Sequence, residues 1–146
     1  MLHSSTRGLE VAGHWSPTPA WRFDGSYTAF HLTPQLAATS LDPLAARSDG
    51  NAPRAQWQLR SAWSPSPRVT LDLAIFHVGP LEQLQVPAHT RADVNAEWRF
   101  TRRLSVLVIG QNLLDPANAE FATASSFLMA TQVPRSVSVR LRWTSR

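Results

Sequence analysis

The chain has 146 residues, which is the size of a single domain. It contains no cysteine, which excludes a disulfide framework, a thiolate metal site and a cysteine nucleophile. Its 14 basic residues are all arginine, and with 10 acidic residues they give a net charge of +4. Because these arginines are scattered rather than gathered into one block, the charge does not indicate a nucleic-acid-binding protein.

Hydrophobic residues make up 43% of the chain, yet no apolar run approaches the roughly 18 residues of a membrane-spanning helix. Residues 1–7 also lack the apolar core of a secretory signal. These observations exclude a helical membrane protein. They leave a soluble β protein, a membrane β protein or a fragment of a larger protein.

Seven segments alternate between apolar and polar residues with a period of two, which is typical of strands with different surroundings on their two faces. In chain order they are residues 8–15, 21–32, 55–63, 69–78, 91–98, 104–112 and 136–143. Strands of this length can cross a bilayer at a tilt. We therefore predict an all-β protein, an antiparallel up-and-down β-meander of about seven strands.

Short and long links alternate strictly between these segments. The short links are residues 16–20, 64–68 and 99–103. The long links are residues 33–54, 79–90 and 113–135. Outer-membrane β-barrels have short turns on the periplasmic side and longer loops on the outer side, so the alternation favours part of a larger transmembrane β-barrel.

One phase of the seven segments contains no aspartate, glutamate or arginine, and we call it the apolar face. It consists of residues 9, 11, 13 and 15; 21, 23, 25, 27 and 29; 55, 57, 59, 61 and 63; 69, 71, 73, 75 and 77; 92, 94, 96 and 98; 104, 106, 108 and 110; and 137, 139, 141 and 143. The other phase, the polar face, is rich in charge. Such a division predicts an apolar environment on one side of the sheet and water on the other.

Most tryptophans lie on the apolar face, next to a short link or the C-terminus. We call them the tryptophan rim: Trp15, Trp21, Trp63, Trp98 and Trp143. An indole has an apolar body and an N–H that needs a partner, so it settles where hydrocarbon meets water. A row of indoles beside an uncharged band predicts the interface girdle of an outer-membrane barrel, with the short turns on the periplasmic side.

The polar face is predicted to line the lumen of this barrel. Its charged residues include Arg22, Asp24, Arg60, Asp72, Arg91, Asp93, Glu97, Arg140 and Arg142. Because they lie on neighbouring strands, we expect cross-strand ion pairs that hold the wall in shape. The alternative is contact with a plug or an anionic ligand, which suits Arg140 and Arg142 best because fewer acidic residues neighbour them.

The same alternation also describes a soluble β-sandwich or a lipocalin-like binding module whose apolar face points inward. The tryptophan rim favours the barrel, since a soluble core has no reason to collect indoles at one end of the sheet. Closed single-chain bacterial barrels have an even number of strands. The odd count and the missing signal together predict that residues 1–146 are the C-terminal portion of a longer barrel protein.

Three segments resemble the C-terminal barrel of TonB-dependent outer-membrane receptors. Residues 6–11, TRGLEV, are similar to a strand opening in that family. Residues 104–116, LSVLVIGQNLLDP, are similar to its penultimate strand, and residues 133–137, VPRSV, to the beginning of its last strand. The chain departs from the family at its end, where Thr144, Ser145 and Arg146 follow the last aromatic residue.

The resemblance implies a transport protein of the outer membrane and not an enzyme. It implies uptake of a scarce nutrient, most often a ferric siderophore, with this chain supplying barrel wall, lumen lining and outer loops. The implied partners are outer-membrane lipid, the rest of the barrel with its plug, and the TonB complex through that plug. It implies no cofactor and no nucleic acid.

No residue pattern indicates catalysis or a metal site. The five histidines show no spacing typical of metal ligands, and no G-x-S-x-G nucleophile motif is present. His77 falls at the outer end of a predicted strand, where we expect an interfacial role. Asn112 is expected to cap the end of its strand.

Replacing Leu73, near the middle of a strand on the apolar face, separates the two interpretations. If this face contacts lipid, Leu73→Arg blocks insertion into vesicles, because a charge at the bilayer midplane costs about 2–4 kcal/mol. If the face lines a soluble core, the unmutated chain is soluble without detergent and the substitution unfolds it. A monomeric chain that folds cooperatively in plain buffer contradicts the barrel interpretation.

Overall fold

The computed structural model describes residues 2–36, 52–115, 117–121 and 131–145. These residues form strands joined by turns and links. The strands are β1 (Leu2–Thr18), β2 (Trp21–Leu36), β3 (Ala55–Ser66), β4 (Val69–Val78), β5 (His89–Arg99), β6 (Leu104–Gln111), β7 (Ala117–Phe121), β8 (Thr131–Pro134) and β9 (Ser136–Trp143). A search of the described residues for a helix long and apolar enough to span a membrane finds none.

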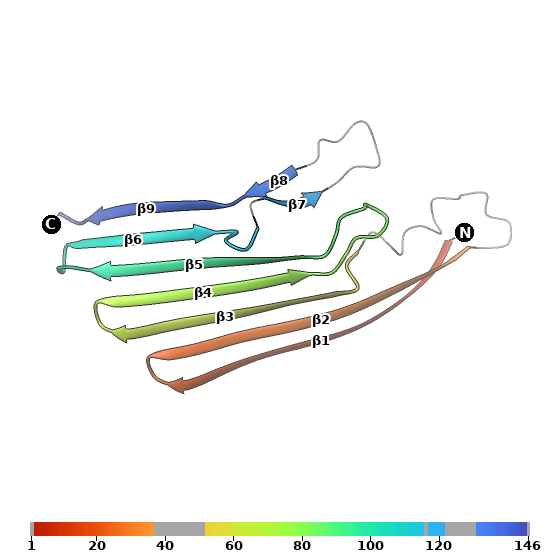
Figure 1. Ribbon diagram of the computed structural model, residues 1–146. Coiled ribbons are helices and arrows are strands. Elements are labelled where there is room, and N and C mark those ends of the chain that lie inside the picture. The colour runs from red at the N-terminus through yellow and green to blue at the C-terminus, as the bar shows by residue number, and fades with distance from the viewer. Residues whose placement is uncertain (1, 37–51, 116, 122–130, 146) are drawn as a thin grey trace.

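Seven strands form one antiparallel sheet in the order β1-β2-β3-β4-β5-β6-β9. In Figure 1 they lie side by side as a single layer, with the short turns and the C-terminus at one end and the long links at the other. Strand β6 pairs with β9 because β7 and β8 form a separate two-stranded sheet between them in the chain. The predicted all-β, up-and-down antiparallel sheet is confirmed.

The ends of several strands differ from the prediction. Strands β1 and β2 have 17 and 16 residues and pair continuously out to Leu2 and Leu36. Backbone pairing continues past the point where the side-chain alternation stops, since the ladder needs no particular side chains. The link predicted over residues 113–135 holds the β7–β8 hairpin, whose strands of five and four residues are too short to show alternation. Residues 37–51 of the first long link lie outside the described part of the chain.

The cross-strand register keeps the two phases apart over the whole sheet. Val11 lies opposite Tyr27, Tyr27 opposite Trp57, and Trp57 opposite His77. Because side chains alternate along every strand, this register puts the apolar phases of neighbouring strands on one face. The apolar face is therefore continuous from β1 to β9.

No described layer covers this apolar face. Among the described residues, the hydrophobic side chains that are buried are Val86 and Ala92. Leu9 and Leu141, which lie on the apolar face near opposite edges of the sheet, remain 61% and 70% exposed. A sandwich would bury such residues against a second sheet packed about 10 Å away, and the described residues form no such sheet.

The junction of β4 with its long link depends on a close backbone approach. The N–H of Gly79 donates a hydrogen bond of 2.9 Å to the carbonyl of Ala55. A Cβ atom on Gly79 would lie 2.9 Å from that same oxygen, which is closer than van der Waals contact allows. Glycine therefore lets the chain leave β4 while it is still bonded to β3.

Gly79→Ala should lower the free energy of unfolding of the sheet by about 1–3 kcal/mol, because the added methyl group forces the Ala55 carbonyl to move. Gly13→Ala is the matched control, since a Cβ atom there would meet nothing within 4 Å. It should change stability by less than about 1 kcal/mol. Urea unfolding of the chain in detergent micelles measures both variants, and equal effects contradict the role of Gly79.

Candidate functional site

The tryptophan rim lies beside the short turns, and its aromatic rings touch across strands. The ring of Trp21 lies 5.9 Å from that of Trp63 and 4.8 Å from that of Phe23. Phe23 in turn stacks on Trp15 at 5.6 Å. The indole N–H of Trp21 donates a hydrogen bond of 2.9 Å to Ser61 Oγ. A polar partner for the N–H and an exposed apolar ring are what an interface position requires.

The rim contains aromatic residues that the sequence analysis did not single out. Phe23 bridges Trp15 and Trp21, and Phe100, in the turn after β5, lies 4.3 Å from Trp98. Phe23 could have been found, because it follows Trp21 by two residues and so shares its face. Phe100 could not, because the alternation ends before the turn.

Ion pairs on the polar face run mainly along strands. Arg22 pairs with Asp24 at 2.8 Å, and Arg91 pairs with Asp93 at 2.7 Å. Each pair joins residues two apart on one strand, which share a face. Asp24 lies opposite Arg60 in the register, yet its carboxylate is engaged by Arg22 instead. For these pairs the expected cross-strand arrangement is wrong, because the long arginine side chain reaches the next residue of the same face on its own strand.

Among the predicted lumen residues in the described part of the chain, one ion pair joins two strands of the sheet. It is formed by Glu97. Its carboxylate lies 3.1 Å from Arg99 on the same strand and 3.5 Å from Arg142 on β9. The Ser105 side chain, on the intervening strand β6, also hydrogen-bonds to it. The expectation that Arg142 has few acidic neighbours is therefore corrected. Arg140 has no ion pair with a described residue.

The middle of the polar face holds a shallow depression of about 360 Å³ that contains charges of both signs. The guanidinium of Arg60 lies over the ring of Phe76, 5.6 Å from its centroid. Asp72 lies opposite Ala62 and Asn95 and makes no ion pair within the described residues. The depression is therefore nearly balanced in charge, as expected for a hydrated wall rather than for a site selective for one charge.

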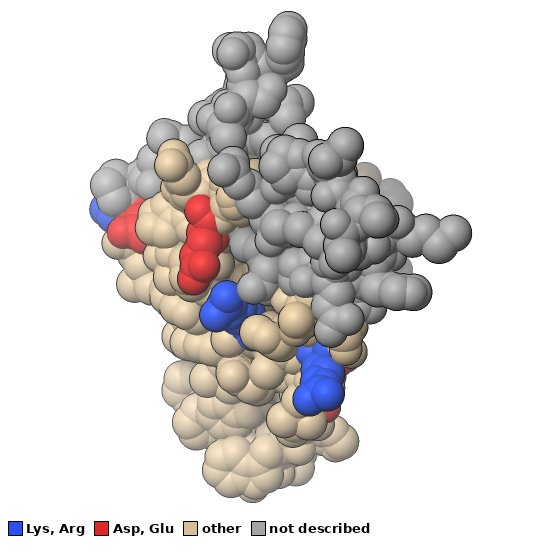
Figure 2. Space-filling model, turned by 90° about the vertical axis from the view of Figure 1, so that its right-hand side faces the viewer, with Lys and Arg blue, Asp and Glu red and all other residues tan. Residues whose placement is uncertain are grey.

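Figure 2 views the molecule from the end that carries the long links. In this view the acidic and basic residues of the described surface lie in separate small areas. No continuous basic surface is visible there on the described atoms.

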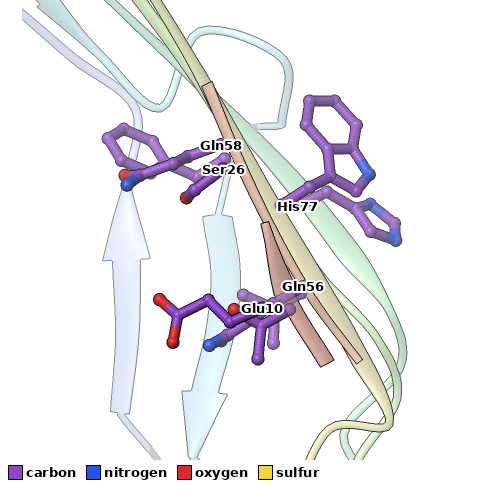
Figure 3. Close-up of a pocket in the computed structure, with 9 residues that line it drawn as sticks. Glu10, Ser26, Gln56, Gln58 and His77 are labelled. Carbon is purple, nitrogen blue, oxygen red and sulfur yellow. The ribbon is translucent and has the colours of Figure 1, made fainter. Parts of the chain in front are cut away.

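A second depression, of about 270 Å³, lies nearer the long links. Glu10, Ser26, Gln56 and Gln58 line it from the polar face, and Figure 3 shows their side chains on one side of the sheet. In the same view His77 projects from the other side. Its ring stacks on Trp57, with centroids 5.5 Å apart and an angle of 16° between the planes.

Asn112 connects the polar face to the segment that leads into β9. It is fully buried and has a φ of 53°, so the chain leaves the ladder in the left-handed region. Its backbone N–H donates to Asp93 Oδ1 at 2.9 Å, and its side-chain amide donates to the Val133 carbonyl at 2.7 Å. The backbone N–H of Leu113, the next residue, donates a hydrogen bond of 2.9 Å to the Ala92 carbonyl on β5.

Asn112 therefore follows the last residue of β6 in the left-handed region, a conformation that asparagine adopts more readily than most residues. The expected capping role is found, with Asp93 of the neighbouring strand as the acceptor. The contact with Val133 was not foreseen, because it joins positions 21 residues apart across a hairpin that the sequence pattern does not show.

Within the described residues, no group of three or more histidine, aspartate or glutamate side chains is placed to hold a metal ion. The charged groups of the polar face are paired or separated rather than gathered around one point. Charged groups arranged in this way can line a water-filled passage or contact a ligand at the surface of the sheet.

No family model matches the sequence, and no curated protein matches it. Several solved structures match its fold. A chain of the FpvAI–pyocin S2 complex is 16% identical, with a TM-score of 0.73 over 96% of this chain and 19% of that chain. The ferric yersiniabactin uptake receptor FyuA from Yersinia pestis is 18% identical, with a TM-score of 0.71 over 96% of this chain and 23% of that chain.

The pyoverdine outer membrane receptor FpvA from Pseudomonas aeruginosa PAO1, bound to pyoverdine, is also similar. It is 17% identical, with a TM-score of 0.68 over 97% of this chain and 22% of that chain. This chain thus spans about a fifth of the length of the structures it matches.

The described residues therefore have the fold of part of the β-barrel of these solved structures. The similar structures include a ferric yersiniabactin receptor and a pyoverdine receptor. The resemblance to siderophore receptors seen in the sequence motifs is therefore confirmed at the level of the fold.

Substitutions at Asn112 should separate its backbone role from its side-chain role. Asn112→Gly keeps the positive φ but leaves the Val133 carbonyl without its donor, at a cost of about 1–3 kcal/mol. Asn112→Ala should cost about 1 kcal/mol more, because alanine also disfavours the left-handed region. Unfolding in micelles measures the stability of both variants. A nitroxide attached to Arg135→Cys, the only cysteine in the labelled chain, reports the local mobility of the segment that leads into β9. Equal stability of the two variants contradicts a backbone role.

Proposed function

We propose that this chain is part of the barrel of a TonB-dependent outer-membrane receptor that takes up a ferric siderophore. The observation that carries the proposal is the continuous apolar face, which no described layer covers and which the tryptophan rim borders at one end. The similar structures named for siderophore uptake support the ligand class. The chain contributes binding and passage, and no bond is made or broken.

The apolar face is proposed to contact lipid, with the tryptophan rim at the periplasmic interface. In hydrocarbon every backbone N–H and C=O must be hydrogen-bonded within the protein. Strands β1 and β9 form the two edges of the seven-stranded sheet. We propose that these edges pair with the rest of a larger barrel, which agrees with the small share of each similar structure that this chain spans.

The polar face is proposed to line the lumen and to face a plug. Its ion pairs along β2 and β5 keep most of the charge neutral, so that the wall stays hydrated without attracting one kind of ion strongly. Arg140, which lies opposite Leu107 and has no ion pair with a described acidic residue, is proposed to meet an anionic group of the plug or of the ligand. Coupling to the TonB complex would occur through the plug.

The outer end of the sheet is proposed to help capture the ligand. The β7–β8 hairpin rises there, and the Asn112 contact with Val133 ties the hairpin to the polar face. In Figure 1 the hairpin lies at the same end of the sheet as the link between β4 and β5, which is where a ligand would meet the receptor from outside.

Deletion of the gene should abolish uptake of at least one radioactively labelled ferric siderophore from a panel of catecholates, hydroxamates and mixed chelators. The gene product should be recovered in the outer-membrane fraction, and the wild-type gene should restore uptake. A product found in the soluble fraction contradicts the barrel. An outer-membrane product whose loss changes uptake of no siderophore in the panel contradicts the ligand class alone.

A further inference from the structure

The two ends of the apolar face differ in chemistry. Near the short turns it carries the tryptophan rim, which has no titratable group. Toward the long links the same phase carries His3 and three further basic residues, which we call the basic rim: Arg7, His31 and His77. Within the described strands no acidic residue falls on this phase at either end.

The spacing along the strands sets Arg7 and His31 at one height. Arg7 precedes Trp15 by eight residues, and His31 follows Trp21 by ten. A strand rises about 3.3 Å per residue. At a tilt of about 40°, eight to ten residues cover roughly 20–25 Å along the membrane normal, which is about the height of the apolar band of a barrel. Arg7 and His31 therefore lie at the outer boundary of that band when the tryptophan rim lies at the inner one. His77 shares the register row of Tyr27 and Trp57, four residues nearer the short turns than His31.

Two residues of the basic rim face each other across β1 and β2. Arg7 lies directly opposite His31 in the register, and both side chains are exposed. Neither makes an ion pair with a described residue. The arginine N–H groups and the imidazole can therefore donate hydrogen bonds outward.

The third residue is held by its neighbours. The His77 ring stacks on Trp57, and its Nδ1 lies 2.9 Å from Thr90 Oγ1 of the next strand. Trp57 lies opposite Tyr27, so that an aromatic row extends from β2 to His77 on β4, four residues nearer the short turns than His31. Figure 3 shows His77 on the side of the sheet opposite to Glu10 and Gln56, and so away from the polar face.

We propose that the basic rim binds the phosphate of an anionic lipid headgroup in the outer leaflet. Arginine presents a fork of N–H donors that matches phosphate oxygens, and weakly hydrated guanidinium tolerates a membrane interface. The aromatic row provides the apolar surface on which the upper part of an acyl chain would lie. The tryptophan rim has no cation on the same face, so the sheet would select charged lipid on one side of the membrane. This inference rests on the proposed function, since it needs the apolar face in lipid.

The test uses the complete gene product, reconstituted into phosphatidylcholine vesicles that contain phosphatidylglycerol. Native mass spectrometry counts the lipid that stays bound. Arg7→Gln with His31→Gln should reduce retained phosphatidylglycerol by roughly fivefold or more, the expected effect of one lost cation near a lipid surface. Arg60→Gln with His14→Gln removes the same residue types from the polar face and should leave retention unchanged.

Flotation of the vesicles in the same samples reports insertion separately. If wild type inserts but the two double variants retain equal amounts of phosphatidylglycerol, the basic rim is not the site. If free inorganic phosphate displaces the lipid, the rim recognises a soluble anion and the lipid proposal is wrong. If wild type does not insert at all, the proposed function fails and not only this inference.

Discussion

The proposed membrane wall depends on one constraint, which is that a sheet placed in hydrocarbon must hydrogen-bond its own backbone and keep charge off the side that meets lipid. The antiparallel ladder from β1 to β9 meets the first condition over the paired lengths of neighbouring strands and leaves the two edges open. The apolar face meets the second. Within the described residues the sheet is a single layer with almost no buried hydrophobic side chain. Under the proposed function, the lipid and the strands that pair with its edges stabilise it.

The sheet could be predicted from the sequence because each strand carries its own signal. Alternation with a period of two is local, and a register slip of one residue would move every side chain to the wrong face. The β7–β8 hairpin and the outer ends of β1 and β2 could not be predicted. These segments pair through backbone hydrogen bonds alone. Where the two faces of a ladder have the same surroundings, polar and apolar residues do not alternate, so the sequence does not show the strand.

The functional residues were predictable to the extent that alternation assigns a face. It assigned Trp21 and Asp24 to opposite sides, and the register agrees. Alternation did not predict that Asp24 pairs with Arg22. The face of the sheet and the position along the strand do not determine which of several arginines within reach a carboxylate binds. The Asn112 contact with Val133 was also beyond reach, since it depends on how the intervening hairpin folds back.

Quenching of indole fluorescence by brominated phospholipids is the most direct test of where the apolar face lies. Bromine near the glycerol end of the acyl chains should strongly quench the tryptophans of the reconstituted protein, since most of them belong to one rim beside the short turns. Phospholipids without bromine provide the reference intensity. Emission that is unaffected by bromine at every depth would show that these rings pack against protein or water, and the membrane-wall interpretation would be wrong.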